Sequence, residues 1–266
     1  MGFQNVFKRY ELKYLLTKEQ KQVILDAMQP YMEQDAFGRS TIRNIYYDTP
    51  NSQLIRTSLE KPVYKEKLRV RSYKTATPES TVFVELKKKY KSVVYKRRVS
   101  VAEQDAMQYL NEGKTLPIQN QITKEMDYFC KFYGNLEPAM FLTYDREAFY
   151  GKEDRDLRIT FDENILWRTE DVSLCSEVYG TPIIEEGYAL MEVKIAGAMP
   201  LWLAQTLSEH QIFKTSFSKY GNAYLQQQKK IEKQKMYEFQ PDGFTYGKAI
   251  PKPQYVQGMA MKEEVV

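Results

Sequence analysis

Three short segments of the sequence, at residues 11–13, 85–87 and 192–194, repeat the pattern Glu-x-Lys with an apolar residue between the two charges. A fourth segment, "KLRVRSY" at 67–73, carries a basic residue at every second position. Because successive side chains of a strand point to opposite faces, such segments predict strands with one charged and one apolar face. Arg and Lys bind phosphate oxygens through charge-assisted hydrogen bonds, and carboxylates beside phosphates hold divalent cations. The residue types therefore point to phosphate chemistry.

Two interpretations of these charged faces are open. For a single strand, a charged face opposite an apolar one is typical of an antiparallel sheet with one side in water. Over the whole chain, however, the faces carry mostly Arg and Lys, and the apolar faces opposite need helices to cover them. The charged faces would then point into a closed sheet, where like charges without a partner are prohibitively costly. This interpretation predicts a water-filled interior that binds a run of phosphates.

The elements that position these residues follow from the spacing of apolar residues. Thr17 and Gln20 form a capping-box pattern at the start of a helix. Strand and helix segments rarely alternate, so we predict an α+β fold, an antiparallel β-barrel or tunnel of about eight strands with a charged interior, wrapped by helices. The predicted strands are 9–16, 40–50, 64–73, 82–89, 93–101, 139–151, 157–168 and 188–195, and the predicted helices are 17–32, 102–112, 122–133, 200–213 and 218–239.

The composition excludes several classes of protein. The 266 residues carry a net charge of +4, which does not by itself indicate nucleic-acid binding. One histidine, His210, leaves little room for histidine catalysis or a zinc site, and Cys130 and Cys175 lack metal-type spacing. No run approaches the length of a membrane-spanning helix or a signal peptide. We expect a cytoplasmic protein with one domain at 1–240 and a tail at 241–266 in loop or disordered form; "GFTYGKAIP" near the C-terminus lacks phosphate-loop spacing.

An ordered set of motifs resembles the catalytic domain of the vacuolar transporter chaperone (VTC) family. The motifs run from about residue 3 to 226: "RYELKY", "YYDTPN", "KEKLRVRSY", "VFVELKKK", "KRRV", "LTYDREAFYG", "LRITFDENI", "LMEVK" and "FSKYGNAY". The resemblance implies a polyphosphate polymerase of the triphosphate tunnel metalloenzyme (CYTH-like) superfamily, whose fold is an antiparallel β-tunnel wrapped by helices. Arg9 stands where the wider superfamily often has the first Glu of Glu-x-Glu-x-Lys, which favours the VTC branch. We recognise no SPX domain or membrane helix, as expected for a stand-alone bacterial member.

The resemblance also implies roles for individual residues, with Mn²⁺ or Mg²⁺ as the cofactor. Glu192 falls at the metal-binding glutamate, and Glu85, Glu11 and Asp162 are weaker metal or charge-balancing candidates. Tyr144 and Ser218 fall at positions that contact phosphate. The basic residues implied to bind the triphosphate and the product are Lys13, Arg69, Arg71, Lys87, Lys96, Arg98, Arg146, Arg158, Lys194 and Lys219.

The implied reaction is transfer of the γ-phosphoryl group of ATP to a growing polyphosphate chain. Two alternatives stay open: a tunnel hydrolase that cleaves a triphosphate or short polyphosphate with water, and a non-catalytic polyanion-binding module. The expected partners are ATP and polyphosphate, and not nucleic acid. The basic segment at 226–235 is expected to be a solvated helix end, with contact to anionic lipid at the inner face of the membrane or to a membrane protein as the alternative. The oligomeric state is open.

Overall fold

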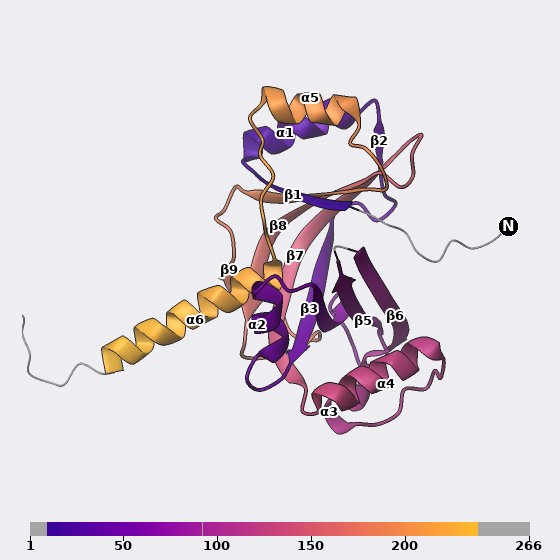
Figure 1. The fold of residues 1–266 in the computed structure, drawn as a ribbon, viewed down its shortest axis with the longest axis vertical. Helices are drawn as coiled ribbons and strands as arrows, with labels where there is room; N and C mark the ends of the chain where they lie inside the picture. Colours follow the sequence, from indigo (N-terminus) through magenta and orange to yellow (C-terminus); the bar gives the residue numbers. More distant parts are fainter. Residues whose placement is uncertain (1–9, 92, 239–266) are drawn as a thin grey trace, which may run out of the picture. The chain divides into compact units, whose positions relative to one another are not determined.

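The alternating segments form one antiparallel sheet in the computed structural model, which describes residues 10–91 and 93–238. Eight strands follow the order β1-β10-β8-β7-β3-β4-β5-β6, and the short strands β2 and β9 pair with β7 and β8 (Figure 1). The predicted antiparallel α+β fold is therefore confirmed. The strands are β1 Tyr10–Leu16, β2 Met32–Gln34, β3 Ser40–Asp48, β4 Tyr64–Ser72, β5 Thr81–Tyr90, β6 Val93–Ala102, β7 Glu137–Gly151, β8 Arg158–Arg168, β9 Thr181–Pro182 and β10 Ala189–Ile195.

The sheet curls into a tunnel wall but is not closed by hydrogen bonds. Its edge strands are β1 and β6, and within the described ranges no backbone pairing joins the two. A side-chain ion pair reaches across this seam instead, with Lys87 Nζ on β5 3.7 Å from Glu11 Oε2 on β1. The sequence pattern predicted a closed sheet, because it shows which face of a strand is charged but not how many strands pair around the ring.

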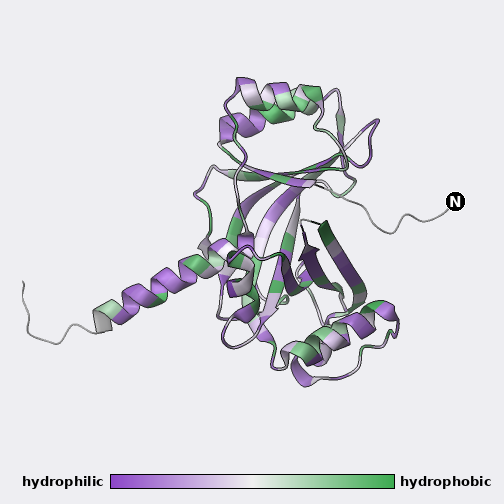
Figure 2. Cartoon of the chain, in the orientation of Figure 1, coloured by the Kyte–Doolittle hydropathy of each residue, from purple (hydrophilic) through white to green (hydrophobic). Residues whose placement is uncertain are grey.

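Helices cover the apolar outer faces, as predicted (Figure 1). Helices α1 and α5 pack on β1, β8 and β10, and helices α3 and α4 pack on the outer face of β4 to β6. Figure 2 shows apolar residues on these helices alternating with hydrophilic ones, as expected for elements with one face in water. The helices are α1 Lys18–Met28, α2 Gln53–Leu59, α3 Glu103–Glu112, α4 Gln121–Tyr133, α5 Leu201–Glu209 and α6 Lys219–Glu238.

The predicted start of α1 agrees with the structure, whereas the predicted end of α5 does not. The capping box forms as expected, with Thr17 Oγ1 accepting from Gln20 N at 3.2 Å and Thr17 N donating to Gln20 Oε1 at 3.1 Å. Helix α5 ends at Glu209, four residues before the predicted end, because Gln211 has a φ of +53° that an α-helix cannot continue through. Arg9, Phe239 and the segment "GFTYGKAIP" lie outside the described residues.

Helix α2, which the sequence did not predict, depends on one buried carboxylate. The residue before α2, Ser52, makes no capping hydrogen bond. Asp48, fully buried at the end of β3, accepts instead from Leu54 N at 2.8 Å and from Ile55 N at 3.0 Å. It also accepts from the Tyr220 hydroxyl at 3.0 Å. Asp48 therefore joins the first turn of α2 to the first turn of α6. It thereby helps to position Lys219, which precedes Tyr220.

We expect Asp48→Asn to lower the free energy of unfolding by about 2–3 kcal/mol, because an amide nitrogen cannot accept the bonds that one carboxylate oxygen accepts here. Urea unfolding measures this change. Tyr220→Phe removes a single hydrogen bond to the same carboxylate and should cost about 1 kcal/mol. Equal losses in the two variants would show that the bonds from Asp48 to α2 contribute nothing.

The chain divides into two compact units at Gln227, and all cavity residues described below belong to the first. No helix in the described part of the chain is both long enough and apolar enough to cross a bilayer.

Candidate active site in a basic cavity

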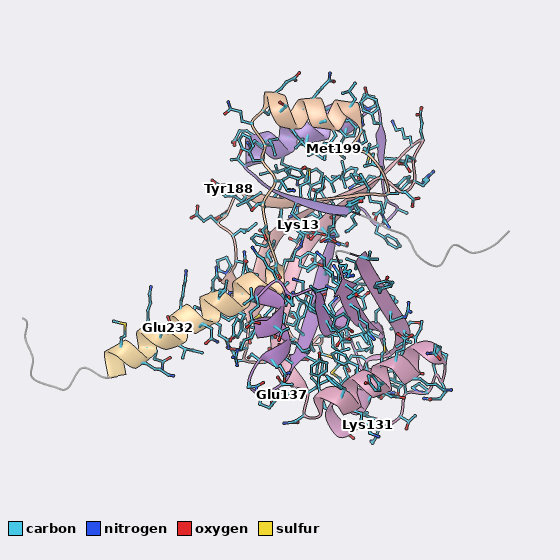
Figure 3. The ribbon with its side chains drawn as sticks, viewed as in Figure 1. Lys13, Lys131, Glu137, Tyr188, Met199 and Glu232 are labelled. Atoms are coloured by element: carbon cyan, nitrogen blue, oxygen red, sulfur yellow. The ribbon has the colours of Figure 1, made fainter. Side chains whose placement is uncertain are left out.

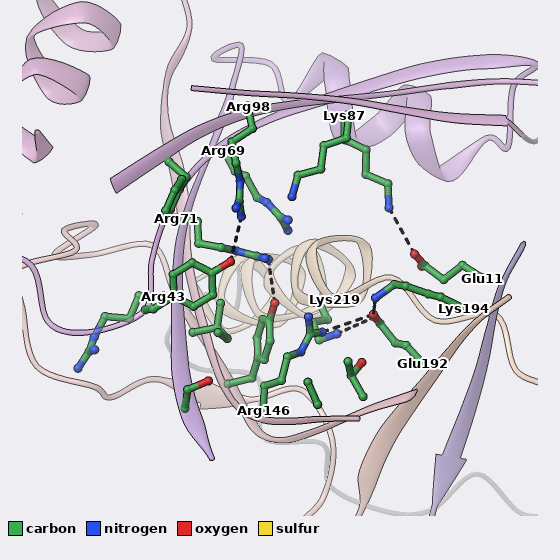
Figure 4. A pocket seen from close by; sticks show the side chains of 18 of the residues that line it. Glu11, Arg43, Arg69, Arg71, Lys87, Arg98, Arg146, Glu192, Lys194 and Lys219 are labelled. Atoms are coloured by element: carbon green, nitrogen blue, oxygen red, sulfur yellow. Dashed lines mark hydrogen bonds and ion pairs between the residues drawn. The ribbon is translucent and has the colours of Figure 1, made fainter. Parts of the chain in front are cut away.

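The inner face of the curled sheet encloses a cavity of about 1450 Å³. Its wall consists of inward-facing residues from β1, β3 to β8 and β10, together with the first residues of α6 (Figure 4). At one end, apolar residues of α2 and α6 pack against the inner face of the sheet. The predicted site residues that line the cavity are Glu11, Lys13, Arg69, Arg71, Lys87, Lys96, Arg98, Tyr144, Arg146, Arg158, Glu192, Lys194, Ser218 and Lys219.

The strand register explains the repeated Glu-x-Lys pattern. Glu11 lies opposite Lys194, and Glu192 lies opposite Lys13, in the pairing of β1 with β10. Glu85 on β5 lies opposite Arg69 on one side and Arg98 on the other. Each acid is thus placed against basic residues of a neighbouring strand, where cross-strand pairs of opposite charge stabilise the sheet.

Glu85 holds the first of two charge clusters. Its side chain is 1% exposed, and Oε2 accepts from Arg69 Nη2 at 2.7 Å. The other oxygen accepts from Arg98 Nε at 2.6 Å and from Lys96 Nζ at 2.5 Å. Burial alone would raise the pKa of Glu85, but the positive charges of Arg69, Arg71 and Lys96 hold it far below its usual value. Both oxygens of Glu85 are therefore occupied by basic groups, and Glu85 itself lies beneath the cavity wall.

Glu192 and Asp162 hold the second cluster. Arg146 Nε donates to Asp162 Oδ1 at 2.6 Å, and Lys219 forms ion pairs with Asp162 and, at 3.0 Å, with Glu192 Oε1. Lys13, labelled in Figure 3, lies 3.6 Å from Glu192 Oε1. Burial opposes ionisation of Glu192, but Lys219 and the other nearby basic groups keep its pKa well below the usual range. The same carboxylates raise the pKa of Lys219, which stays charged despite its burial.

The guanidinium of Arg71 is held by neutral groups, and the sequence did not predict all of them. Arg71 donates to Asn44 Oδ1 and to the Tyr144 hydroxyl, both at 2.9 Å. Arg69 donates to the Tyr46 hydroxyl at 3.1 Å, and the Tyr46 ring stacks on Tyr220 with centroids 4.4 Å apart. The alternation of residues 40–48 places Asn44 and Tyr46 on one face, but that face carries no charge and so gave no signal. Arg71 differs from the basic residues of the two clusters because its partners, Asn44 and Tyr144, are neutral.

Two predicted positions lie at the limits of the cavity. Arg158 lines it but is exposed, whereas Asp162 is fully buried behind Arg146 and Lys219. Among the labelled residues of Figure 4, Arg43 points away from the two clusters, so it is not grouped with them. The structure thus brings the predicted basic residues to one cavity, with carboxylates between them.

The carboxylates of the cavity fit a divalent cation that is bound jointly by the protein and by phosphate. They do not fit a metal site in which protein side chains supply all the ligands. In residues 10–91 and 93–238 no group of three or more His, Cys, Asp or Glu side chains is arranged to hold an ion. Glu192 lines the cavity, however, with basic groups at both of its oxygens. Mg²⁺ in proteins is commonly held by one or two carboxylates, with substrate phosphates and water completing the shell. Glu192 satisfies that requirement, and Glu11 lies on the adjacent strand.

Comparison with known proteins places the chain among tunnel folds. A family model described as the VTC domain matches residues 8–227. A candidate adenylate cyclase from Bacillus halodurans is 15% identical, with a TM-score of 0.50 over 80% of this chain and 94% of its own. A candidate adenylyl cyclase from Hippeastrum, described as having a dominant triphosphatase activity, is 17% identical, with a TM-score of 0.49 over 79% of this chain and 92% of its own. No curated protein matches the chain.

Proposed function

The chain belongs to the VTC domain family, and from this premise we propose that it is a polyphosphate polymerase that uses ATP as phosphoryl donor. The observation that carries the proposal is the large cavity lined by basic residues from eight strands, β1, β3 to β8 and β10, and from α6. Its volume of about 1450 Å³ exceeds the roughly 300–1,000 Å³ typical of small-molecule sites. The space suits a donor triphosphate together with the end of an acceptor chain.

In the proposed reaction, a terminal oxygen of the polyphosphate chain attacks the γ-phosphorus of ATP. The bond from that phosphorus to the β–γ bridging oxygen breaks, and ADP leaves with the electron pair. Such a transfer depends mainly on positioning and on stabilisation of charge. Arg69 and Arg71 from one wall and Arg146 and Lys219 from the other would hold the phosphates in line.

The carboxylates of the cavity favour a phosphate acceptor over water. A general base works best when its pKa lies near the operating pH, and charge pairing keeps Glu192, Asp162 and Glu85 far more acidic than that. A phosphate chain end is already anionic and needs no base to become a nucleophile. Water would need one, and none of these three carboxylates is suited to that role, so their charge pairing disfavours hydrolysis with a carboxylate as the base.

Glu192 is the residue that we propose holds Mn²⁺ or Mg²⁺, with Glu11 nearby. Such an ion would neutralise charge on phosphoryl oxygens. Because basic groups occupy both Glu192 oxygens, we expect the ion to bind together with phosphate, which draws those groups away.

The test is incubation of the purified protein with ATP and Mn²⁺, followed by gel electrophoresis for polyphosphate. We expect long chains and ADP, and complete loss of product when EDTA removes the metal. Release of free phosphate without polymer would contradict the proposal and indicate a hydrolase. Tight binding of polyphosphate that survives EDTA, with no turnover, would indicate a binding module.

A further inference from the structure

One lysine of the cavity differs from its neighbours in having no carboxylate partner. Lys67 lies on β4 and faces the cavity two residues before Arg69. Within the described residues, no carboxylate oxygen lies within 4 Å of Lys67 Nζ. The other cavity lysines that we assign to the site each form at least one ion pair: Lys13, Lys194 and Lys219 with Glu192, Lys87 with Glu11, and Lys96 with Glu85.

Among the residues that the structure describes, the hydrogen-bond partner of Lys67 is the Ser218 hydroxyl, which can itself donate a proton. Lys67 Nζ donates to Ser218 Oγ at 3.2 Å, and Gly221 N donates to the same oxygen at 3.1 Å. A serine oxygen accepts two hydrogen bonds, and its O–H donates one. With both acceptor positions used, the Ser218 hydroxyl is left as a donor. With Lys67 in its ammonium form, Lys67 and Ser218 therefore present only donors to the cavity, which is the chemistry of an anion site.

The groups around Lys67 are almost all positive. Lys65 and Arg69 flank it on β4, Lys87 faces it from β5 and Lys13 from β1, and their repulsion adds to burial. Burial is the largest cause, and together these effects lower the pKa of Lys67 to about 7.

In the part of the chain that the structure describes, the elements on the remaining sides of Lys67 offer no counter-ion. From α6, the Tyr220 ring lies with its centroid 5.9 Å from Lys67 Nζ. From β3, Asp48 faces the same side of the sheet, but its carboxylate accepts from Tyr220 and from the backbone of α2, and it forms no ion pair with Lys67. An anion entering the cavity would therefore be the first counter-charge that Lys67 meets.

We propose that Lys67 and the Ser218 hydroxyl form a separate phosphate subsite, which binds a phosphate of the polymer and takes up a proton when it does so. This inference rests on the proposed function only in taking polyphosphate as the ligand. The phosphate supplies the missing counter-charge, so the ammonium form of Lys67 becomes favoured in the complex. Burial also lowers the pKa of Lys96, to about 8, and that of Lys194, so these two lysines add to the proton uptake. Lys67 differs from them because it has no carboxylate partner to favour its charged form, whereas Lys96 pairs with Glu85 and Lys194 with Glu192.

The experiment is calorimetric titration of the full chain with long-chain inorganic polyphosphate at pH 8, without metal, in two buffers of different ionisation enthalpy. Internal phosphates of a long chain do not titrate near neutrality, so proton uptake reports on the protein. We expect net proton uptake by the unmodified protein. In Lys67→Arg, whose charge does not titrate in this range, we expect uptake to fall by the share that Lys67 contributes, with binding retained.

Two further variants test the binding role itself. Lys67→Met should weaken polyphosphate binding by about tenfold, and Ser218→Ala by a smaller factor. Unchanged thermal unfolding of each variant shows that it is folded. Equal proton uptake in the unmodified protein and Lys67→Arg, or unchanged affinity in Lys67→Met, would overturn the subsite. No polyphosphate binding by the unmodified protein would instead overturn the proposed function, so the two failures are distinguishable.

Discussion

Arg71→Met is expected to lower the rate of polymer formation by about a thousandfold, because a positioned arginine on the transferring phosphoryl group contributes at least that much. The substitution leaves no carboxylate without a partner, since Arg71 bonds only to the neutral Asn44 and Tyr144. The melting temperature should fall, because the buried Asn44 loses a donor, but by less than the removal of a partner from a buried ion pair would cause. Initial rates with ATP and Mn²⁺ measure the loss.

Arg168 provides the control, because it is another buried arginine whose acceptors are mostly backbone oxygens, with one long ion pair to Asp171 Oδ2 at 3.5 Å. It donates to the backbone oxygens of Asp171, Glu177 and Tyr179, and it does not line the cavity. Arg168→Met should lower the melting temperature, while polymer formation by the folded fraction stays near that of the unmodified protein. Equal losses of activity in the two variants would show that Arg71 acts through folding and not on phosphate.

Glu85→Gln is expected to lower the free energy of unfolding by about 3–5 kcal/mol, which is the cost of removing one partner from a buried ionic cluster. Three basic groups then lie close together without their shared counter-charge. Polyphosphate supplies negative charge, so saturating ligand should restore part of the lost stability, and the affinity for polyphosphate should rise. Chemical denaturation with and without polyphosphate measures both effects.

The pH dependence of this loss has a definite sign. The pKa of Glu85 is lower in the folded protein than in the unfolded chain, so its contribution is present above the unfolded value and disappears as the pH falls toward the folded value. The difference between Glu85→Gln and the unmodified protein should thus be largest near neutrality and shrink below a pH of about 4.

Glu163 offers the control for Glu85, since it too is shared by basic groups, two instead of three, but does not line the cavity. Its oxygens lie 3.0 Å from Lys21 Nζ and 2.7 Å from Arg39 Nη1, and its side chain is 25% exposed. Glu163→Gln should cost less than about 1 kcal/mol, without recovery on addition of polyphosphate. Comparable recovery in both variants would mean that the ligand stabilises the fold generally and does not replace the Glu85 charge.

The alternation of charged and apolar residues predicted most of the fold, because it is set by the pleat of a strand. It also placed Arg69, Arg146 and Lys194 on the inner face. Register was out of reach, because pairing joins residues far apart in the chain. Without it, Lys67 and Lys87 look equivalent, although one has no carboxylate partner and the other reaches Glu11. In the same way, the role of Glu85 could not be decided, since three basic groups meet it only after β4, β5 and β6 have paired.

Helix α2 escaped prediction for a related reason. A helix start is recognised by a capping residue immediately before it, but the cap here is Asp48, five residues ahead of Gln53. The sequence predicted the turn at 48–50. It did not predict that Asp48 in this turn accepts hydrogen bonds from the first turn of a helix.

The unpaired edges of β1 and β6 determine how easily the diameter of the tunnel can change. Widening a fully hydrogen-bonded barrel would break a ladder of backbone bonds, each of which leaves two polar groups to satisfy. Across this seam the described residues form a long ion pair between Lys87 and Glu11, both partly exposed to water, and such pairs are worth about 1 kcal/mol or less. We therefore expect the tunnel to accommodate ligands of different width at small energetic cost, while the backbone hydrogen bonds between the eight paired strands are kept.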